Sequence, residues 1–295
     1  MILDIDRLQV NAESEMDVSV IKVGSCSYPV VVMDNVYSDP DYIRELALFL
    51  EYDRRFSDTT SRSLGVYPKG LKEIARIGLD QRHFFEVLHK NWANHYIPDR
   101  EKFISHIPRE VIFSRLNPSE GSFDKSFAKP RYGRTMFSGV LYLNTDEQCR
   151  GGLGFYLHRR TGFDEFLDLS LMEAVESKTS LYDKSVLGAI YDMSSFDKVE
   201  YLRDVGKLEY YSKSLKIIHN EPIVRKAYTS GSDETWLLFD FVEMKFNRLV
   251  FFPSFVFHAQ HYQDNWFGNF PETQCLTQEF AYHWIPTANE SHSLG

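Results

Sequence analysis

The spacing of apolar residues changes along the chain, and the first part predicts two strands followed by a helix. Residues 20–38 contain two extended apolar runs, broken by Ser-Tyr-Pro. Next, Asp39 is placed to cap a helix and Pro40 suits its first turn. The apolar positions of that helix lie three and four residues apart, at Ile43, Leu46, Ala47 and Leu50.

A second helix is predicted from Leu71 to about Asn94. The stretches LKEIARIGL and FFEVLHKNW keep apolar residues three and four apart. The preceding SLGVYPKG contains both Pro and Gly, which is typical of a loop. We expect such helices to pack on one outer face of a sheet formed by later strands.

From residue 110 onward the pattern indicates strands, interrupted by one long helical segment. Residues 163–218 are charged and amphipathic, contain no Pro, and predict an ordered helical insert. Short strands separated by Gly, Pro and Asn turns favour a β-sandwich or barrel. The predicted strands occupy residues 110–117, 137–144, 151–158, 234–244, 247–254, 255–262 and 275–285.

These elements predict one domain covering residues 1–295. Neither block of strands is long enough to close a core alone, so we expect the two blocks to share one. The predicted divisions are N-terminal strands and helices in 1–109, a β core in 110–162 and 219–285, and the insert in 163–218.

Composition narrows the functional class. Aromatic residues make up 15% of the chain, which favours a β-rich core. The formal net charge of -9 argues against a broad nucleic-acid surface. No apolar run approaches the roughly 20 residues that span a bilayer, and the acidic N-terminus is unlike a secretory signal. The three cysteines show no CxxC pair, which indicates a reducing compartment and predicts a cytoplasmic protein.

Several stretches resemble the iron- and 2-oxoglutarate-dependent oxygenases, and their prolyl-hydroxylase-like branch in particular. RRTG after His158 and the block MKFNRLVFFPS are similar to a bacterial subfamily of uncharacterised oxygenase-like proteins. The resemblance implies a double-stranded β-helix (a jelly roll, cupin-like), with N-terminal flanking helices and a helical insert. The stretches that carry it are VVVMDNVYSDPDYIREL, GVLYLN, GGLGFYLH, NRLVFFPS, FHA, WFG and LTQEFAYH.

The family implies an iron site made from two histidines and one carboxylate. His258 follows the Pro-Ser turn and a short strand, as the family's second histidine does; the alternative is a buried histidine that bonds across the sheet. His261 is either an assisting ligand or a rim residue. The loop at residues 120–135, where the first histidine should lie, contains none, and Asp124 is the carboxylate in the right part of it.

The cation that should hold 2-oxoglutarate is also absent from its usual place. The matching position before Leu-Thr-Gln is Cys275, and no Lys or Arg follows Arg248. An arginine from another strand would have to replace it. The candidates are Arg115, Arg134, Arg159 and Arg160, with Tyr142 as a further cosubstrate contact.

Two explanations fit these departures. In the first, an iron site is rebuilt from His258 with His158, His261 or His283, and with Asp124. In the second, the ligands are lost and the barrel mouth binds a ligand or a partner without metal.

Two further groups have alternative roles. The trio of His158, Arg159 and Arg160 either binds an anion or caps acidic residues of the insert, with Arg160 as a candidate substrate contact. Trp266, like Trp236 and Trp284, either lines a substrate wall or packs the sheets.

The predicted function is an Fe(II)- and 2-oxoglutarate-type oxygenase-like protein. Its substrate would be a small molecule, an amino acid or a peptide side chain, hydroxylated at a rearranged metal site. The alternative is a non-catalytic binding module or partner subunit. The insert would be a lid or the arm of a homodimer, and no nucleic-acid or membrane partner is expected.

Overall fold

The structure is a computed structural model that describes the N-terminal region of the chain and the strands named below. Its helices lie mainly near the N-terminus, and none of those described is long and apolar enough to cross a membrane. The described residues are 3–24, 27–52, 72–78, 103–105, 110–116, 129–133, 137–165, 213, 216–218, 220–221, 229–263, 266–282 and 284–286.

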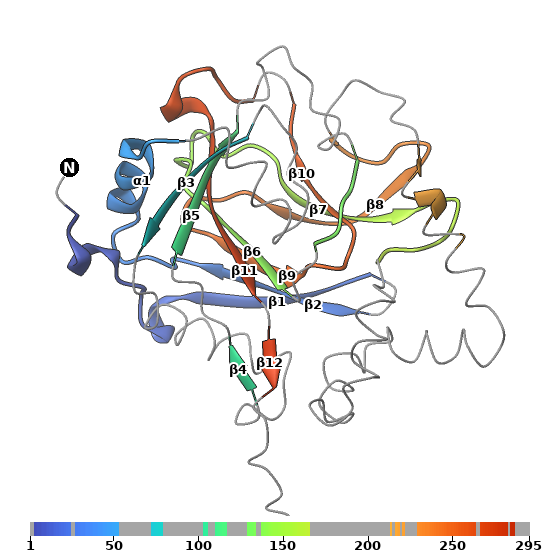
Figure 1. The fold of residues 1–295 in the computed structure, drawn as a ribbon, viewed down its shortest axis with the longest axis horizontal. Coiled ribbons are helices and arrows are strands. Elements are labelled where there is room, and N and C mark those ends of the chain that lie inside the picture. Colours follow the sequence, from blue (N-terminus) through green and yellow to red (C-terminus); the bar gives the residue numbers. More distant parts are fainter. Residues whose placement is uncertain are drawn as a thin grey trace, which may run out of the picture.

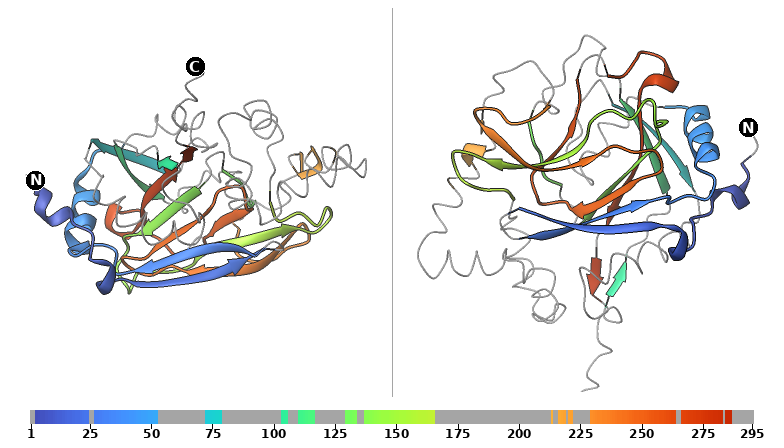
Figure 2. Two further views of the ribbon diagram at one scale, coloured as in Figure 1. Left: turned by 90° about the horizontal axis from the view of Figure 1, so that it is seen from below. Right: turned by 180° about the vertical axis from the view of Figure 1, so that it is seen from behind.

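The largest element is a seven-stranded antiparallel sheet (Figures 1 and 2). Its strand order is β1-β2-β9-β6-β11-β5-β3, so β6 is the central strand and lies between β9 and β11, which come from late in the sequence. The bounds are β1 Asp17–Val23, β2 Tyr28–Asp34, β3 Lys72–Gly78, β5 Glu110–Leu116, β6 Phe137–Tyr142, β9 Leu249–Pro253 and β11 Cys275–Tyr282.

A second antiparallel sheet has three strands in the order β10-β7-β8. These are β10 His258–His261, β7 Gly152–His158 and β8 Trp236–Glu243, and the register between β7 and β8 shifts at Phe155/Tyr156. A small pair joins β12 Trp284–Pro286 to β4 Phe103–Ser105. The helices with described bounds are η1 Ile5–Leu8, η2 Glu13–Glu15, α1 Pro40–Phe49 and η6 Pro271–Thr273.

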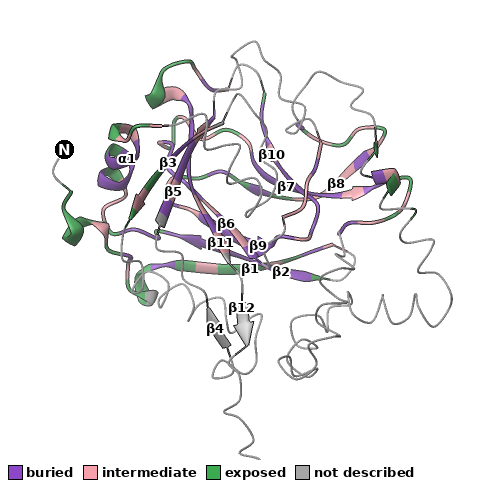
Figure 3. Cartoon of the chain, in the orientation of Figure 1, coloured by how far each residue is buried: buried purple, intermediate pink, exposed green. Residues whose placement is uncertain are grey.

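Alternation along the strands creates two separate apolar clusters. In β9, Val250 and Phe252 belong to a cluster that also contains Phe155 and Val242 of the three-stranded sheet. The side chains between them, such as Phe251, belong to a cluster on the opposite face of the large sheet, together with α1 residues. The two sheets therefore pack face to face, with buried residues concentrated on the strands (Figure 3).

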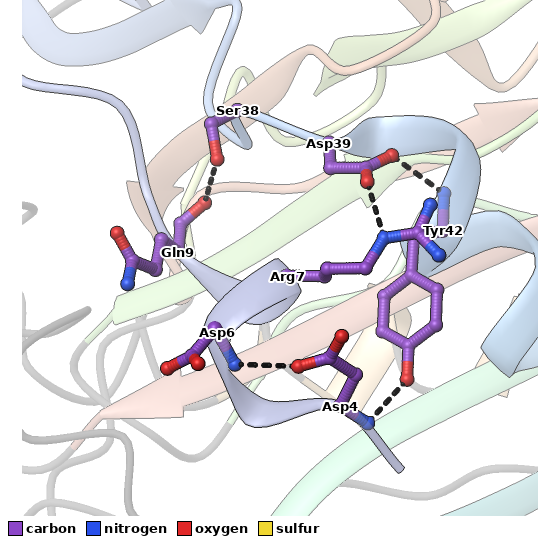
Figure 4. A network of polar contacts seen from close by, with 7 residues as sticks. All are labelled: Asp4, Asp6, Arg7, Gln9, Ser38, Asp39 and Tyr42. Atoms are coloured by element: carbon purple, nitrogen blue, oxygen red, sulfur yellow. Dashed lines mark hydrogen bonds and ion pairs between the residues drawn. The ribbon is translucent and has the colours of Figure 1, made fainter. Parts of the chain in front are cut away.

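The predicted first helix is confirmed as α1. The Asp39 side chain accepts a hydrogen bond from the Tyr42 backbone nitrogen at 3.1 Å, and Pro40 occupies the first turn. The N-terminal segment is held against this helix start (Figure 4). Arg7 Nε donates to Asp39 at 2.6 Å, and the Asp4 backbone nitrogen donates to the Tyr42 hydroxyl at 2.6 Å.

The predicted second helix is wrong over its first residues. β3 Lys72–Gly78 is an edge strand that pairs antiparallel with β5. Glu73 stands opposite Arg115 and forms an ion pair with it at 2.7 Å, while Ile74 and Ala75 are buried. Pairing with the backbone of β5 outweighs the local helical spacing, because it satisfies a row of donors and acceptors at the sheet edge. Residues 79–94 lie outside the described residues.

The first predicted break is also displaced. Tyr28 and Pro29 belong to β2, and the chain reverses before them, at Gly24 and Ser27, both with positive φ. The mostly β character of the chain is confirmed by the two antiparallel sheets. Residues 166–212 of the predicted insert are outside the described part, and residues 216–218 near its end are helical.

Candidate functional site

The first residue of β10, His258, faces the interior between the two sheets. It stands opposite Phe155, which belongs to the cluster shared by the sheets. Its ring meets the Phe252 ring edge-on, with 4.7 Å between centroids. Only 7% of the residue is exposed. The position predicted for a metal ligand is therefore an interior one.

The hydrogen bonding of His258 defines its tautomer. Nδ1 lies 2.8 Å from the carbonyl oxygen of Val256, so Nδ1 carries the proton and donates it. Burial, and secondarily the charge of Arg131, lowers the pKa of His258 to about 3. The ring is therefore neutral at pH 7, with the lone pair on Nε2. A neutral imidazole fixed through Nδ1 by a carbonyl is the usual state of a metal-ligating histidine.

His261 lies on the opposite face of the same strand. Its Nε2 is hydrogen-bonded to the hydroxyl of Tyr156, and its ring packs on Phe241 with 4.7 Å between centroids. Burial lowers the pKa of His261 to about 4. Residues three apart on a strand point to opposite sides, so His261 does not approach the interior nitrogen of His258.

His158 also belongs to the outer side of the three-stranded sheet. Its ring meets Trp236 at 4.9 Å between centroids, within the outer-face cluster that includes Tyr156. Nδ1 bonds to the Thr161 hydroxyl at 2.9 Å, and Nε2 is 3.5 Å from the Glu221 carboxylate. Burial lowers the pKa of His158, and Glu221 partly opposes that effect. These contacts favour the strand-end role over the metal-ligand role.

The other predicted site residues that the structure describes are two arginines, a tryptophan and a tyrosine. Arg159 and Arg160 are exposed, and Arg159 Nε donates to the Asp233 carbonyl at 2.8 Å. Trp266 is half-buried against the cluster between the sheets, as expected for a packing residue. Tyr142 is fully buried and faces the interior, where its hydroxyl donates to Gln260 at 3.0 Å.

Asp124, Arg134 and His283 lie outside the described residues, as does His106. Among the residues that are described, no three His, Cys, Asp or Glu side chains are grouped so as to hold a metal ion. Of the predicted metal ligands that the structure describes, His258 lies in the interior between the sheets, and His158 and His261 do not.

One described carboxylate shares a row with His258 across the three-stranded sheet. Asp240 of β8 pairs with Phe155, which in turn pairs with His258. Burial raises the pKa of Asp240. Asp240 is two strands away from His258, with about 4.8 Å between neighbouring strands. This separation is too large for the two side chains to bind the same ion.

The interior face of β11 carries polar groups and no cation. Cys275 is buried, and its Sγ is 3.7 Å from the Tyr262 hydroxyl. Further along the same face, Ser114 of β5 bonds to Thr277 and to Glu279, each at 2.8 Å. The structure thus places a thiol, a hydroxyl and a carboxylate along the strand where the resemblance implies a basic residue.

Sequence reasoning missed a basic residue that does lie beside His258. Arg131 forms an isolated antiparallel bridge with His258, outside the named strands. Neither a motif nor a periodic pattern marks the stretch KPRYG, and its pairing with β10 depends on the tertiary fold. Gln260 and Tyr262, which share the interior face with His258, were detectable from the two-residue period of the strand.

Comparisons with protein-family models, curated proteins and solved structures found no match to this chain. The resemblance to the oxygenases therefore stays a prediction from the sequence.

Proposed function

We propose that the two sheets form a double-stranded β-helix of the oxygenase type. Support comes from the way the chain moves between them: β5 and β6 belong to the large sheet, β7 and β8 to the small one, and β9, β10 and β11 alternate. This alternation is what a jelly roll requires, because its strands are distributed between two facing sheets. His258 then begins a strand that lines the interior.

We further propose that the protein is an Fe(II)- and 2-oxoglutarate-type oxygenase acting on a small molecule, an amino acid or a peptide side chain. The observation that carries this proposal is the state of His258, which is interior, neutral and held through Nδ1 by Val256. His258 would bind iron through Nε2, and Asp124 would supply a carboxylate. The bound iron and 2-oxoglutarate would supply the oxidising chemistry for hydroxylation.

The roles of the surrounding residues follow from their contacts. The Val256 carbonyl orients the imidazole and keeps Nδ1 protonated. Phe252 packs edge-on against the ring, and Phe155 packs in turn against Phe252, so the ring lies beside apolar side chains. Gln260, held by Tyr142, places an amide two residues along the same face, suited to orienting a polar substrate.

Anaerobic titration with Fe(II) and 2-oxoglutarate tests the proposal. We expect a saturable visible charge-transfer band at one equivalent of iron, absent from His258→Ala. His261→Ala is the matched control, because this histidine lies on the same strand but faces the other way, and it should retain the band. No band in the wild type, together with no iron by elemental analysis, would reject the oxygenase function.

The second candidate is a metal-free binding module on the same fold. It is favoured by the outward position of His158 and His261, and by the lack of a three-ligand group among the described residues. This candidate predicts that the protein binds no stoichiometric iron and that His258→Ala leaves ligand binding unchanged. The same titration and metal measurement decide between the two.

A further inference from the structure

The outer face of the three-stranded sheet is covered in part by the end of the predicted insert. Ile218, the last residue of that insert, is buried in a cluster with Trp236 of β8 and Tyr156 of β7. Three residues later, the Glu221 side chain reaches His158 at the end of β7, with 3.5 Å between the carboxylate and Nε2. This part of the chain is therefore joined to the sheet by an apolar contact and by a polar one.

His158 is an incompletely paired polar group within this contact. Its side chain is fully buried, at 0% exposed. The Thr161 hydroxyl oxygen accepts from the Phe163 backbone nitrogen, so its own proton is available to His158 Nδ1 at 2.9 Å. The ring proton then lies on Nε2, on the side of Glu221. Nε2 forms no hydrogen bond within the described part of the chain, and its 3.5 Å distance from the carboxylate is longer than an ordinary one.

Charged groups from several elements act on His158. Glu221 favours the imidazolium, whereas Arg160 and Lys129 oppose it. Asp233, in the loop before β8, already accepts hydrogen bonds from two backbone nitrogens at the start of that strand. Burial has the largest effect, and it lowers the pKa of His158 in spite of Glu221. A proton on this ring is therefore better accommodated when water reaches the ring than when the ring is covered.

We propose that His158 and Glu221 form a proton-sensitive contact that keeps the chain around Ile218 on the outer face of the sheet at neutral pH and releases it in acid. In the closed arrangement the neutral ring is covered and lies edge-on to Trp236. In the open arrangement water hydrates the imidazolium. The inference goes beyond the proposed function and does not depend on iron, because this contact lies on the opposite face of the small sheet from His258.

The direction of the pH effect follows from the two arrangements. The open arrangement binds the proton more tightly, because burial lowers the pKa of His158 when the contact is closed. Acid therefore shifts the equilibrium toward the open arrangement. The contact is complete above about pH 6.5, the ordinary pKa of an exposed histidine, and is lost as the pH falls toward the lowered value.

Hydrogen–deuterium exchange on the full chain, corrected for intrinsic exchange rates, tests this proposal between about pH 7.5 and about pH 5. We expect the peptide with Ile218 and Glu221 to lose protection by about 3- to 30-fold. The upper figure corresponds to an open-state pKa of about 6.5 and a closed state that takes up no proton. Peptides from β1 and β2 of the large sheet should keep their protection. Equal loss in all peptides would show global acid unfolding and overturn the proposal.

Substitutions make the test specific to His158. His158→Gln removes the titrating group, so protection of the same peptide should become independent of pH in this range. His261→Gln is the matched control, because that buried histidine faces the same side of the sheet but bonds to Tyr156, and the wild-type pH dependence should persist. A pH dependence that survives in folded His158→Gln, or wild-type protection that does not change with pH, would overturn the proposal.

Glu221→Gln serves if the histidine variant does not fold. It removes the carboxylate that favours the imidazolium, so the closed arrangement becomes still less able to take up a proton. Its loss of protection at about pH 5 should therefore exceed that of the wild type. The same protection as the wild type at every pH would reject the role of this carboxylate, and with it the proposed contact.

Discussion

His258 and His261 stand on one strand, in the short stretch HAQH, yet they belong to different parts of the molecule. His258 lies between the sheets against Phe252, whereas His261 lies on the outer face against Phe241. Burial depresses the pKa of both, so both are neutral at pH 7. Their charge state does not distinguish them.

The difference lies in which ring nitrogen each histidine uses. In His258, Nδ1–H donates a hydrogen bond to the backbone carbonyl of Val256, which leaves the lone pair of Nε2 for a ligand. In His261 the Tyr156 hydroxyl occupies Nε2 itself. A candidate metal ligand is therefore recognised by the face of the strand and by the free lone pair, and not by residue type or proximity in sequence.

Removing the packing on the interior side should have the strongest consequence. Phe252→Ala deletes a fully buried ring that contacts both Phe155 and His258, and should lower the free energy of unfolding by about 3–5 kcal/mol. On the outer face, Phe241 is 37% exposed, and Phe241→Ala should cost about 1 kcal/mol or less. Urea unfolding followed by fluorescence measures both, and equal losses would contradict the assignment of faces.

Acid should destabilise the protein through both histidines. Because the folded-state pKa values of His258 and His261, about 3 and about 4, lie below the usual value, the unfolded chain binds more protons as the pH falls. The stability that depends on these two histidines being neutral is fully present above about pH 6.5. It is progressively lost as the pH falls toward their folded-state pKa values. The free energy of unfolding should therefore fall between pH 7 and pH 5.

Substitution by glutamine isolates each contribution. His258→Gln should reduce the loss of stability between pH 7 and pH 5 by about 2 kcal/mol, measured by urea unfolding at each pH. His261→Gln should give a similar reduction over that range, and the two variants should separate only below about pH 4. A wild-type slope that neither variant changes would show that other groups control the acid sensitivity.

The smallest expected change in stability comes from removing one of two tyrosine hydroxyls, one on the interior face and one on the outer face. Tyr142→Phe removes the bond to Gln260, and Tyr156→Phe removes the bond to His261. Each should lower the free energy of unfolding by about 1 kcal/mol. We expect only Tyr142→Phe to alter ligand affinity in the interior, because Tyr156 faces outward. An effect of Tyr156→Phe on iron or 2-oxoglutarate binding would place His261 in the site after all.

Much of the β framework was predictable from local pattern, whereas one edge strand was not. The apolar alternation and turn residues indicated the strands that became β5 to β11, and Asp39 with Pro40 indicated the start of α1. The stretch at residues 72–78 has helical spacing and yet forms β3, because its backbone completes the edge of the large sheet. Local spacing contains no information about that pairing.

Some residues of the candidate site were also predictable from the sequence, and others were not. The position of His258 after a Pro-Ser turn made it the candidate metal ligand, and the sequence showed Cys275 where the resemblance implies a basic residue. Arg131 was not identifiable, because its bridge to His258 joins segments more than a hundred residues apart in the sequence. Asp124 and Arg134 lie outside the described residues and stay predictions.

Residue types and their period thus predicted a β-rich chain, and the resemblance singled out His258 as a candidate ligand and two positions where this sequence departs from the oxygenase pattern. Which histidine faces the interior, which nitrogen is available and which arginine stands beside it depended on how the sheets pair and pack. The physical reason is that strand pairing and burial are set by contacts between distant segments, and those contacts also select tautomers and shift pKa values.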